Sequence, residues 1–456
     1  MANPLLIPEI VYLLSGFFTP REATEPARVC QLWRDVFSEI IWRTCRVDER
    51  ACARGLDQEG LTRNAHHIRT LVYGDNITLG RYLAPCTQLT TLKLYNTVML
   101  QNSDEWSQAT DFVQKNVNLH TVVIGPGVEA PVEFWTQLAS RRSLRSLDID
   151  GANLSQQQLH EFLKGSKSLQ DLSIHSVCPW DRKMEQASDD VYPNLGVLHL
   201  GICIWWPLHK VDFLKQCPCV RSLIIEATTA GPVVPLEALT KVLSEGHLQR
   251  LESIKLWGIF CDDTLAPCLT AIPPLKELTI NRFGALSFEA LSRHFASLKR
   301  ITMRSNQFTG VMIETTLESC PCLTYISAKR ILATRITQGK PWICRALETF
   351  AVAIIVDTDI DAEISAQSRG VFEQLAQLTC LINLQFGFKD KTTQGLDCRL
   401  ESGFDQLATL QRLRRLNFSH TVQNMSAADV EWVRTNFKST DVVGVCNEHG
   451  TFDQQP

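Results

Sequence analysis

The stretch that decides the fold is "LRSLDI" at residues 144–149, because "LQDLSI" (169–174) and "LGVLHL" (195–200) follow it with the same pattern. Each fits the template apolar-x-x-apolar-x-apolar. The fourth and sixth positions are two residues apart, so both side chains point to one face of a short strand. Close copies also stand at 89–94, 251–256, 275–280 and 413–418, and looser ones begin at residues 68, 119, 220, 298, 323, 347 and 381.

Most of these roughly fourteen copies start 23 to 26 residues apart. This spacing and template are typical of leucine-rich repeats. The intervening "LSQQQLHEFLKGSKS" (154–168) places Leu159, Phe162 and Leu163 on one helical stripe and ends with Gly165 as a helix stop. The sequence therefore predicts an α/β leucine-rich-repeat solenoid, a horseshoe with parallel strands on its concave side and helices on its convex side.

The turn after each strand departs from the usual repeat. Asn or Cys, three residues after the sixth position, normally bonds the backbone of the turn, and here it occurs only as Asn76, Cys203 and Asn306. We therefore expect the turns to satisfy their backbone groups in another way.

Composition bounds the class of protein. With 456 residues the chain exceeds the usual size of a single core. Its 45 basic and 49 acidic residues give a net charge of -4, which is not typical of nucleic-acid or acidic-membrane binding. Sixteen cysteines, mostly among apolar residues, indicate a reducing compartment, so we expect a cytoplasmic or nuclear protein.

The sequence predicts neither a sorting signal nor a membrane anchor. No apolar run is long enough for a membrane span. "IVYLLSGFF" (10–18) has no basic residue before it and is interrupted upstream by Pro4, Pro8 and Glu9, so we do not expect a cleaved signal.

Several motifs resemble chemical sites without meeting their requirements. "VVIGPGVEA" (122–130) has the spacing of a dinucleotide fingerprint, but Pro131 follows and the strand is in phase with the repeats, so we interpret it as a turn. "DTDID" (357–361) lacks the later Gly and Glu of a calcium loop. "CPC" at 217–219 and 320–322 lies in distant repeats, and "HH" at 66–67 has no spaced partner, so zinc is not expected. We predict no catalytic residue, no metal, no cofactor and no enzyme activity.

The N-terminal segment does not follow the repeat. In "IPEIVYLLSGFF" (7–18), Ile10, Leu13, Leu14 and Phe17 predict a helix from about Pro8 to Gly16. After a polar turn with a short helical piece, Thr24 is expected to cap a second helix through residue 42. Its apolar residues are more than one small core requires, which indicates a partner or the solenoid itself as cover. They are Val29, Cys30, Trp33, Val36, Phe37, Ile40, Ile41 and Trp42. The alternative is a simple N-terminal cap on the repeats.

The order P-L-x-I-P-E-I, then A-R-V-C-Q-x-W-R-D, then W-R, over about residues 3–45, resembles the F-box, particularly the F-box-like form that precedes leucine-rich repeats in fungal proteins. The matching residues are Pro4, Ile7, Pro8, Glu9, Ile10, Val29, Cys30, Trp33, Arg34 and Trp42. The resemblance implies docking on the Skp adaptor of a cullin–RING ubiquitin ligase, with the repeats binding a substrate protein. It implies adaptor contacts at Ile7, Pro8, Ile10, Leu13, Leu14, Val29, Cys30 and Trp33.

We expect four regions: the F-box-like unit (1–46), a linker or cap (47–63), the repeats (64–440) and a C-terminal cap and tail (441–456). Template positions three, five and seven should line the concave face, which is acidic with histidines first and basic later. Candidate substrate-binding residues there are Tyr95, Asp148, His175, His199, Glu226, Lys255, Trp257, Arg304, Tyr325 and Lys329. A solvated polar face is the alternative, and a repeat scaffold or inhibitor without a ligase link is the rival function.

Overall fold

The computed structural model describes residues 7–53, 56–74, 86–95, 103–126, 128, 130–151, 156–175, 191–201, 212–226, 236–258, 261–303, 308–387, 395–419, 425–438 and 440–444. The chain divides into two compact units, unit 1 (Met1–Val220) and unit 2 (Arg221–Pro456). Within the described ranges no helix has both the length and the apolar character needed to span a membrane.

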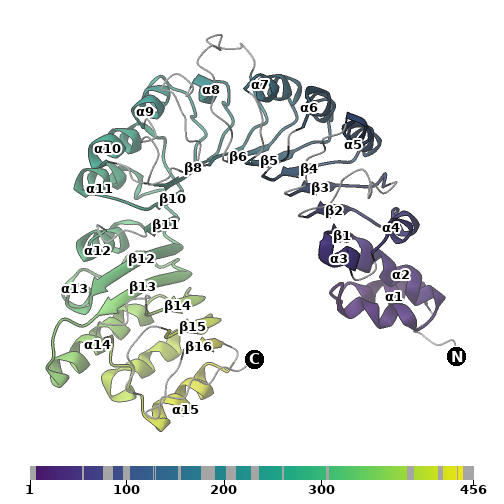
Figure 1. Ribbon diagram of the computed structural model, residues 1–456. Helices are drawn as coiled ribbons and strands as arrows, with labels where there is room; N and C mark the ends of the chain where they lie inside the picture. The colour runs from purple at the N-terminus through teal and green to yellow at the C-terminus, as the bar shows by residue number, and fades with distance from the viewer. Residues whose placement is uncertain are drawn as a thin grey trace. The chain divides into compact units, whose positions relative to one another are not determined.

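Unit 1 begins with a small helical group and continues as alternating strands and helices (Figure 1). Its strands pair in parallel, each with its neighbour in sequence. The elements are α1 (Pro8–Ser15), η2 (Glu22–Thr24), η3 (Pro26–Arg28), α2 (Gln31–Trp42), β1 (Thr44–Val47), α3 (Glu49–Ala53), α4 (Gln58–Asn64), β2 (Thr70–Tyr73), β3 (Thr91–Leu94), α5 (Ser103–Lys115), β4 (Thr121–Ile124), α6 (Val132–Ala139), β5 (Ser146–Asp150), α7 (Gln156–Gly165), β6 (Asp171–His175), β7 (Val197–Leu200) and α8 (Asp212–Lys215).

Unit 2 continues the pattern, again with parallel pairing in sequence order. Helices cover one side of the strands throughout (Figure 1). The elements are β8 (Ser222–Glu226), α9 (Leu236–Ser244), β9 (Ser253–Trp257), α10 (Asp262–Ala271), β10 (Glu277–Ile280), α11 (Ala285–Leu291), η6 (Ser292–His294), β11 (Arg300–Met303), α12 (Gly310–Ser319), β12 (Tyr325–Leu332), α13 (Ala333–Gln338), β13 (Thr349–Ile355), α14 (Asp361–Ala376), β14 (Asn383–Gln385), η7 (Leu400–Ser402), η8 (Phe404–Thr409), β15 (Arg415–Asn417), α15 (Ala427–Asn436) and β16 (Asp441–Val443).

The register of the strands confirms the repeat template. Fourth-position residues pair with fourth-position residues, as Leu147 does with Leu172 and Leu278 with Ile301. The first, fourth and sixth positions are buried, and the fifth lies between them on the more exposed face. Each of the fourteen copies coincides with a strand, so the α/β repeat architecture is as predicted.

Two further strands lie outside the span of 64–440 that was expected for the repeats. β1 belongs to "WRTCRV" (42–47), which also fits the template, but its first position, Trp42, is the last residue of α2. β16 keeps only the apolar fourth position, Val442, so its sequence carries almost no signal. The parallel strands therefore begin directly after α2.

The second N-terminal helix is not continuous, which corrects the expectation of one helix capped by Thr24. The Thr24 hydroxyl donates to the Arg21 carbonyl instead. A 3-10 turn closes where the Val29 N–H donates to the Pro26 carbonyl (3.1 Å), and Cys30 is then extended, with φ -160° and ψ 176°. The helix restarts at Gln31, and this change of phase turns Val29 outward.

Serine side chains link successive repeats at the start of their strands. A serine directly before the first template position donates to the carbonyl of the first-position leucine one repeat earlier. The pairs are Ser143 with Leu119 (3.0 Å), Ser168 with Leu144 (2.9 Å) and Ser297 with Leu275 (2.7 Å).

Two buried polar side chains make an equivalent link from the end of a helix to the preceding repeat. Asn116 accepts a hydrogen bond from the N–H of Leu89 (3.0 Å) and donates to a carbonyl of that repeat. His294 accepts from the N–H of Leu275 through Nδ1 (3.2 Å), and its Nε2 lies 2.9 Å from the Leu269 carbonyl oxygen. Both links join a first-position residue to the next repeat.

Candidate functional site

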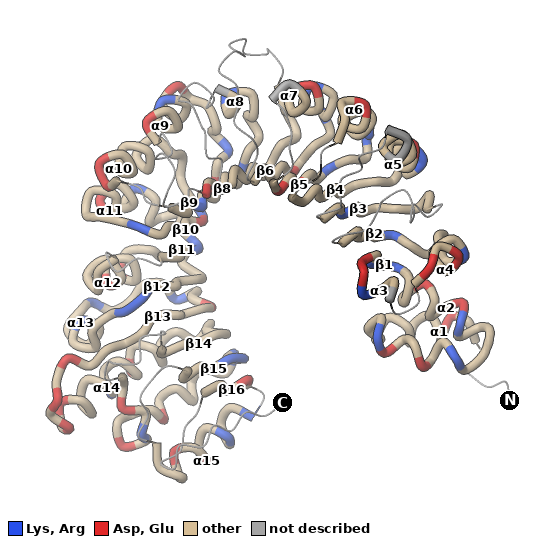
Figure 2. The backbone as a smooth tube through the Cα atoms, in the orientation of Figure 1, with Lys and Arg blue, Asp and Glu red and all other residues tan. Residues whose placement is uncertain are grey.

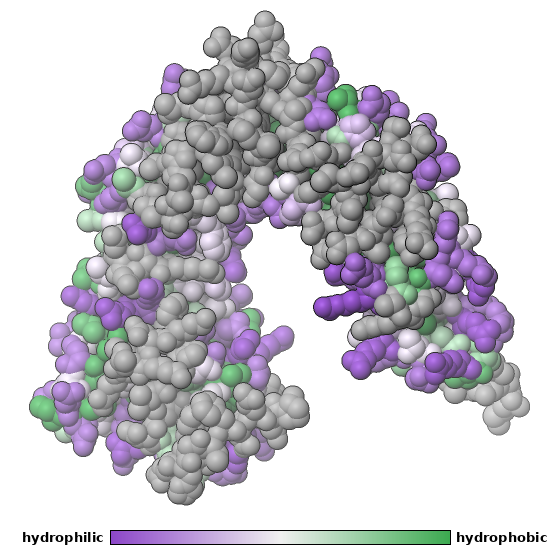
Figure 3. Space-filling view, viewed as in Figure 1, coloured by the Kyte–Doolittle hydropathy of each residue, from purple (hydrophilic) through white to green (hydrophobic). Residues whose placement is uncertain are grey.

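The N-terminal helices carry a concentration of exposed apolar side chains. Within the described ranges, twelve large apolar residues are exposed, and five of these lie between residues 7 and 29. The three most exposed are Phe17 (86%), Leu13 (73%) and Val29 (65%), and Ile7 and Tyr12 complete the group. The surface over α1 and α2 shows hydrophobic patches among hydrophilic residues (Figure 3). We call these five residues the N-terminal apolar surface.

The core of this helical group lies on the other side of α1. Val11, Ala23, Val36 and Phe37 are buried together. Phe18 meets Phe37 edge-on at 5.3 Å, and Trp33 stacks on Phe37 at 5.5 Å between ring centroids. Leu13 and Phe17, two members of the apolar stripe predicted for the first helix, therefore face solvent and not the core, whereas its other two members, Ile10 and Leu14, are half-buried.

The residues implied as adaptor contacts fall into two groups. Ile7, Pro8, Leu13 and Val29 are exposed. Ile10, Leu14, Cys30 and Trp33 are half-buried, and Trp33 contributes to the core. A substitution at Trp33 would thus disturb folding and docking together, whereas Leu13 and Phe17 can be changed at the surface alone.

On the open face of unit 1, three neighbouring strands bring polar side chains into one row. Asp148 on β5, Ser173 on β6 and His199 on β7 occupy the fifth template position and pair in register. His175, at the end of β6, stands two residues after Ser173 and therefore on the same face. Predicted residues Asp148, His175 and His199 thus lie together, and the stacking of repeats also identifies Ser173, which the sequence reasoning missed.

The contacts in this row are close. Ser173 Oγ shares hydrogen bonds with His175 Nε2 (2.7 Å) and His199 Nδ1 (3.3 Å). The two imidazole rings meet edge-on at 4.1 Å between centroids. Asp148 Oδ1 lies 3.9 Å from His175 Nε2, and it is inaccessible to solvent and accepts no hydrogen bond within the described structure. Imidazole nitrogens and carboxylate oxygens side by side are groups that can share a proton or bind a metal ion.

Two glycines make room on this face. A Cβ atom on Gly201, which follows β7, would lie 2.1 Å from His175 Nδ1, so the ring occupies the space that a side chain would need. Tyr95, another predicted site residue, packs in the same way against Gly125, where a Cβ would lie 2.9 Å from the tyrosine ring. Tyr95 is therefore half-buried and apart from the histidines.

In unit 2 the predicted residues are spread along several strands. Glu226 ends β8, Lys255 and Trp257 lie on β9, and all three are half-buried. Tyr325 starts β12, three strands from β9, which is about 14 Å at the usual strand spacing. The basic and acidic positions can be followed along the strands in Figure 2.

Tyr325 and Lys329, two further residues of this prediction, differ in their surroundings. Arg300 of β11 lies over the Tyr325 ring at 4.3 Å from its centroid and 3.8 Å from Glu277. Lys329 sits at the irregularity between Ala328 and Arg330 in the pairing of β12 with β13. Arg304 lies outside the described residues. No single cluster contains all the unit 2 candidates that are described.

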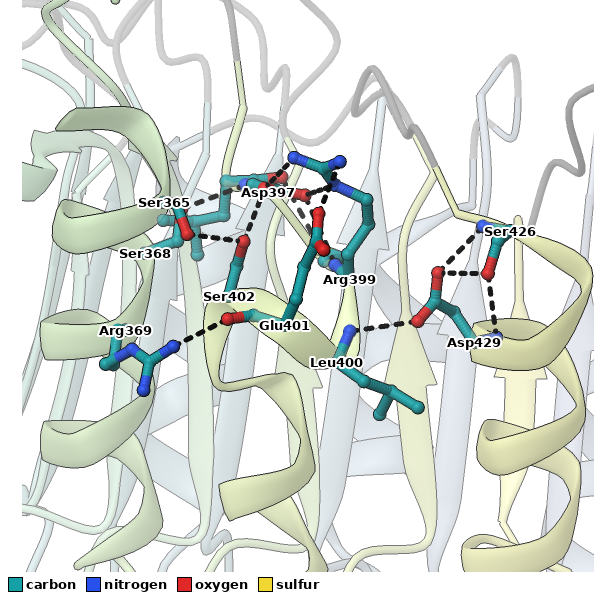
Figure 4. A network of polar contacts seen from close by, with 12 residues as sticks. Ser365, Ser368, Arg369, Asp397, Arg399, Leu400, Glu401, Ser402, Ser426 and Asp429 are labelled. Carbon is teal, nitrogen blue, oxygen red and sulfur yellow. Dashed lines mark hydrogen bonds and ion pairs between the residues drawn. The ribbon is translucent and has the colours of Figure 1, made fainter. Parts of the chain in front are cut away.

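A buried polar network on the helical side of unit 2 was not predicted (Figure 4). Arg399 donates to both carboxylate oxygens of Asp397 (2.8 and 2.7 Å), and the Ser402 hydroxyl donates to the same carboxylate. Burial alone would raise the pKa of Asp397, but the hydrogen bonds from Arg399 and Ser402 outweigh it and hold that pKa below its ordinary value. Ser365 contacts Ser402 (2.9 Å). The network joins α14 to η7, which is a structural role.

Comparison with known proteins gives structural similarity only. No family model and no curated protein matches the sequence. Among solved structures, an internalin from Listeria monocytogenes is 13% identical, with 88% of this chain and 94% of that chain covered and a TM-score of 0.36. The structure of the yeast Rad7 and Elc1 complex gives 13% identity, with 77% of this chain and 90% of that chain covered, and a TM-score of 0.41. A leucine-rich-repeat protein of Leptospira interrogans is 13% identical, with 76% of this chain and 100% of that chain covered and a TM-score of 0.36. None of these comparisons assigns the chain to a family.

Proposed function

We propose that this chain is a protein-binding repeat protein that serves as the substrate-recognition subunit of a cullin–RING ubiquitin ligase. In this proposal the N-terminal apolar surface docks on a Skp-type adaptor, and through it on a cullin. The open face of the strands binds the substrate protein. The chain itself supplies binding surfaces and no chemistry.

The N-terminal apolar surface is the observation that carries the proposal. Five large apolar side chains exposed within 23 residues are costly in water and are typical of a surface that a partner covers. The core of the helical group is formed without them, so they are not needed for its folding. Four of the eight contacts that the F-box resemblance implies, Ile7, Pro8, Leu13 and Val29, are exposed here.

A pull-down between the purified full-length chain and a purified Skp adaptor tests the docking. Wild type should bind, and the variant Leu13→Glu, Phe17→Glu should lose binding, because two buried charges at an interface oppose association. Leu286→Glu, an exposed apolar position on α11, is the matched control and should bind like wild type. Equal capture of the double variant, or no capture of wild type, would reject adaptor docking here.

The second candidate is a repeat scaffold or inhibitor without a ligase link. It is favoured by the open face, which presents half-buried polar and aromatic residues such as Trp257 and Tyr325. If wild type binds no adaptor, this candidate stands. Once a partner protein that binds the open face has been identified, Trp257→Ala should weaken its affinity by about tenfold or more. Unchanged affinity would show that Trp257 is not part of the interface.

A further inference from the structure

Two strands of unit 2 extend beyond the repeat template. β12 has eight residues and β13 has seven, whereas the other strands that the structure describes have three to five. The two extensions, residues 330–332 and 353–355, pair with each other. Lys329 is the extra residue at which the register of this pairing shifts. A bulge of this kind redirects the side chains near it, and bulges are frequent next to active sites.

These extensions line a cavity of about 430 Å³. Another part of its lining is the start of α12, at Thr309 and Gly310. The residues from β12 and β13 belong to the C-terminal ends of parallel strands, which is the edge of the sheet where α/β proteins commonly bind their ligands. The volume also lies within the range of small-molecule sites. The cavity is therefore a candidate binding site.

The charged side chains around this cavity are basic. Lys329, Arg330 and Arg335 line it, and no Asp or Glu is among the described residues of the lining. Arg335 is held by Glu314, with 3.4 Å between Nη1 and Oε2. The Arg330 side chain is exposed and makes no ion pair or hydrogen bond within the part of the chain that the structure describes. Three cationic groups around one cavity favour an anionic ligand.

The start of α12 adds a hydrogen-bond donor to the same cavity. The Thr309 hydroxyl accepts the Met312 N–H (3.4 Å), but the N–H of Gly310 meets no acceptor among the described residues. Such free N–H groups and the dipole of the helix favour negative charge at this end. A Cβ on Gly310 would lie only 3.3 Å from Arg335 Cδ, so the glycine gives room for the arginine beside the helix start.

The remaining lining is apolar, which limits the kind of anion. It is formed by Phe308, Ile331, Leu332 and Ile355. A bare inorganic ion would leave this apolar surface uncovered, whereas an organic anion can cover it. A phosphate monoester carries a charge of about -1.5 to -2 at pH 7 and three acceptor oxygens, and guanidinium groups match its geometry. A carboxylate brings only one charge to the same three cations.

We propose that this cavity binds the phosphate group of an organic phosphate monoester. Lys329, Arg330, Arg335 and the N–H of Gly310 are the donors, and the apolar lining contacts the body of the ester. A free small molecule and a phosphorylated side chain of a partner protein present the same group to the cavity. All of these residues lie in unit 2, so the site is independent of adaptor docking through the N-terminal apolar surface.

Calorimetric titration of phenyl phosphate into the full-length chain, at low salt in a buffer without phosphate, tests the proposal. Wild type should show a saturable site. Inorganic phosphate, which lacks the apolar body, and benzoate, which has one charge, should each bind roughly tenfold more weakly or worse. Benzoate binding as tightly as phenyl phosphate would contradict a phosphate site.

Arg330→Glu should weaken phenyl phosphate binding by roughly tenfold or more, because a cationic donor becomes an anion. Arg412→Glu is the matched control: it makes the same change at an exposed arginine of unit 2 outside the lining and should bind like wild type. Lys329→Gln is a second variant that should also weaken binding, and circular dichroism checks that each variant is folded. Affinity unchanged by Arg330→Glu and by Lys329→Gln would overturn the proposal.

A peptide with one phosphoserine distinguishes the two sources of the phosphate group. Tighter binding of this peptide than of phenyl phosphate would assign the site to a phosphorylated partner protein. Weaker binding would assign it to a free organic phosphate, and both results require that Arg330→Glu reduces the affinity. No saturable binding of either probe to wild type would refute the site.

Discussion

At the scale of single residues, His294 is the side chain whose loss we expect to be felt most in unit 2. It is buried and bonds both an N–H and a carbonyl of the preceding repeat. His294→Ala would leave both groups unsatisfied and should cost about 3 kcal/mol of unfolding free energy. His294→Asn should recover part of this, because Asn116 makes the equivalent link in unit 1. Urea denaturation measures both, with the half-buried His247→Ala as the control; a smaller loss for His294 than for His247 would contradict the assignment.

The same residue gives a pH dependence. Burial lowers the pKa of His294, and a backbone hydrogen bond to Leu269 only partly offsets this. The unfolded chain therefore takes up the proton first as the pH falls. The contribution of His294 is fully present above about pH 6.5, the ordinary histidine value, and is lost as the pH drops below it. The His294→Asn variant should show a flatter stability profile between pH 7 and 5.5, and an unchanged slope would speak against a neutral, buried imidazole.

Asp397 should give a pH dependence of the same sign at lower pH. Its lowered pKa means that its contribution to stability is present above about pH 4, the ordinary aspartate value, and is lost as the pH falls through the folded value. Asp397→Asn should cost about 2 kcal/mol at pH 7, because Arg399 and Ser402 lose a charged acceptor. Asp405→Asn, an exposed aspartate on η8, is the control. Equal denaturation midpoints for the two variants would refute the role of the network.

At the scale of elements, α2 lacks a side-chain capping hydrogen bond at its N-terminus. Its N-cap, Cys30, has the extended backbone of a cap, yet its side chain makes no capping hydrogen bond. Cys30→Ser should supply one and stabilise the helical group by about 1 kcal/mol. Cys52→Ser, in unit 1 but outside any cap position, should not. Thermal unfolding of both variants checks this, and no gain for Cys30→Ser over Cys52→Ser would show that the cap is not limiting.

The elements also show how far the sequence could lead. The strands were predictable because the first, fourth and sixth positions are apolar. Only β1 and β16 were not predicted: the first position of the β1 copy belongs to α2, and the β16 copy keeps only its fourth apolar position. The split between η3 and α2 was not predictable from the apolar stripe, because it depends on an extended backbone at Cys30. The serine links could have been predicted, since a serine directly precedes the copies that begin at 144, 169 and 298. The role of these serines is visible only when the repeats are stacked.

The candidate functional residues were also predictable only in part. Listing open-face positions placed Asp148, His175 and His199 on one face, and the structure brings them onto adjacent strands, because the repeat period fixes which residues become neighbours. That Gly201 makes space for His175 depends on side-chain volume, which periodicity does not contain. The outward direction of Leu13 and Phe17 depends on which side of α1 meets Phe37, and a helical stripe alone does not decide this.

At the scale of the whole molecule, buried thiols should make the chain sensitive to alkali. Burial raises the pKa of Cys268 to about 12, and it similarly raises the pKa of Cys45, Cys217 and Cys320 to about 12 and of Cys86 and Cys344 to about 11. Above the ordinary thiol value the unfolded chain loses these protons first, so stability is full below about pH 8 and falls by up to about 1.4 kcal/mol per pH unit for each thiol. Denaturation midpoints at pH 8 and 10 measure the slope. Cys268→Ala should flatten it, whereas Cys261→Ala, an exposed thiol beside the same helix, should not; equal slopes would contradict the assignment.

The serine and histidine links between repeats also have a direction. In each link, the later repeat supplies the side chain and the earlier repeat supplies the backbone group. During synthesis, a repeat that has just left the ribosome therefore still has an unmet carbonyl or N–H until its successor emerges. Folding of these segments should proceed one repeat behind translation, and a stalled chain would always present one incomplete end, open to chaperones and proteases.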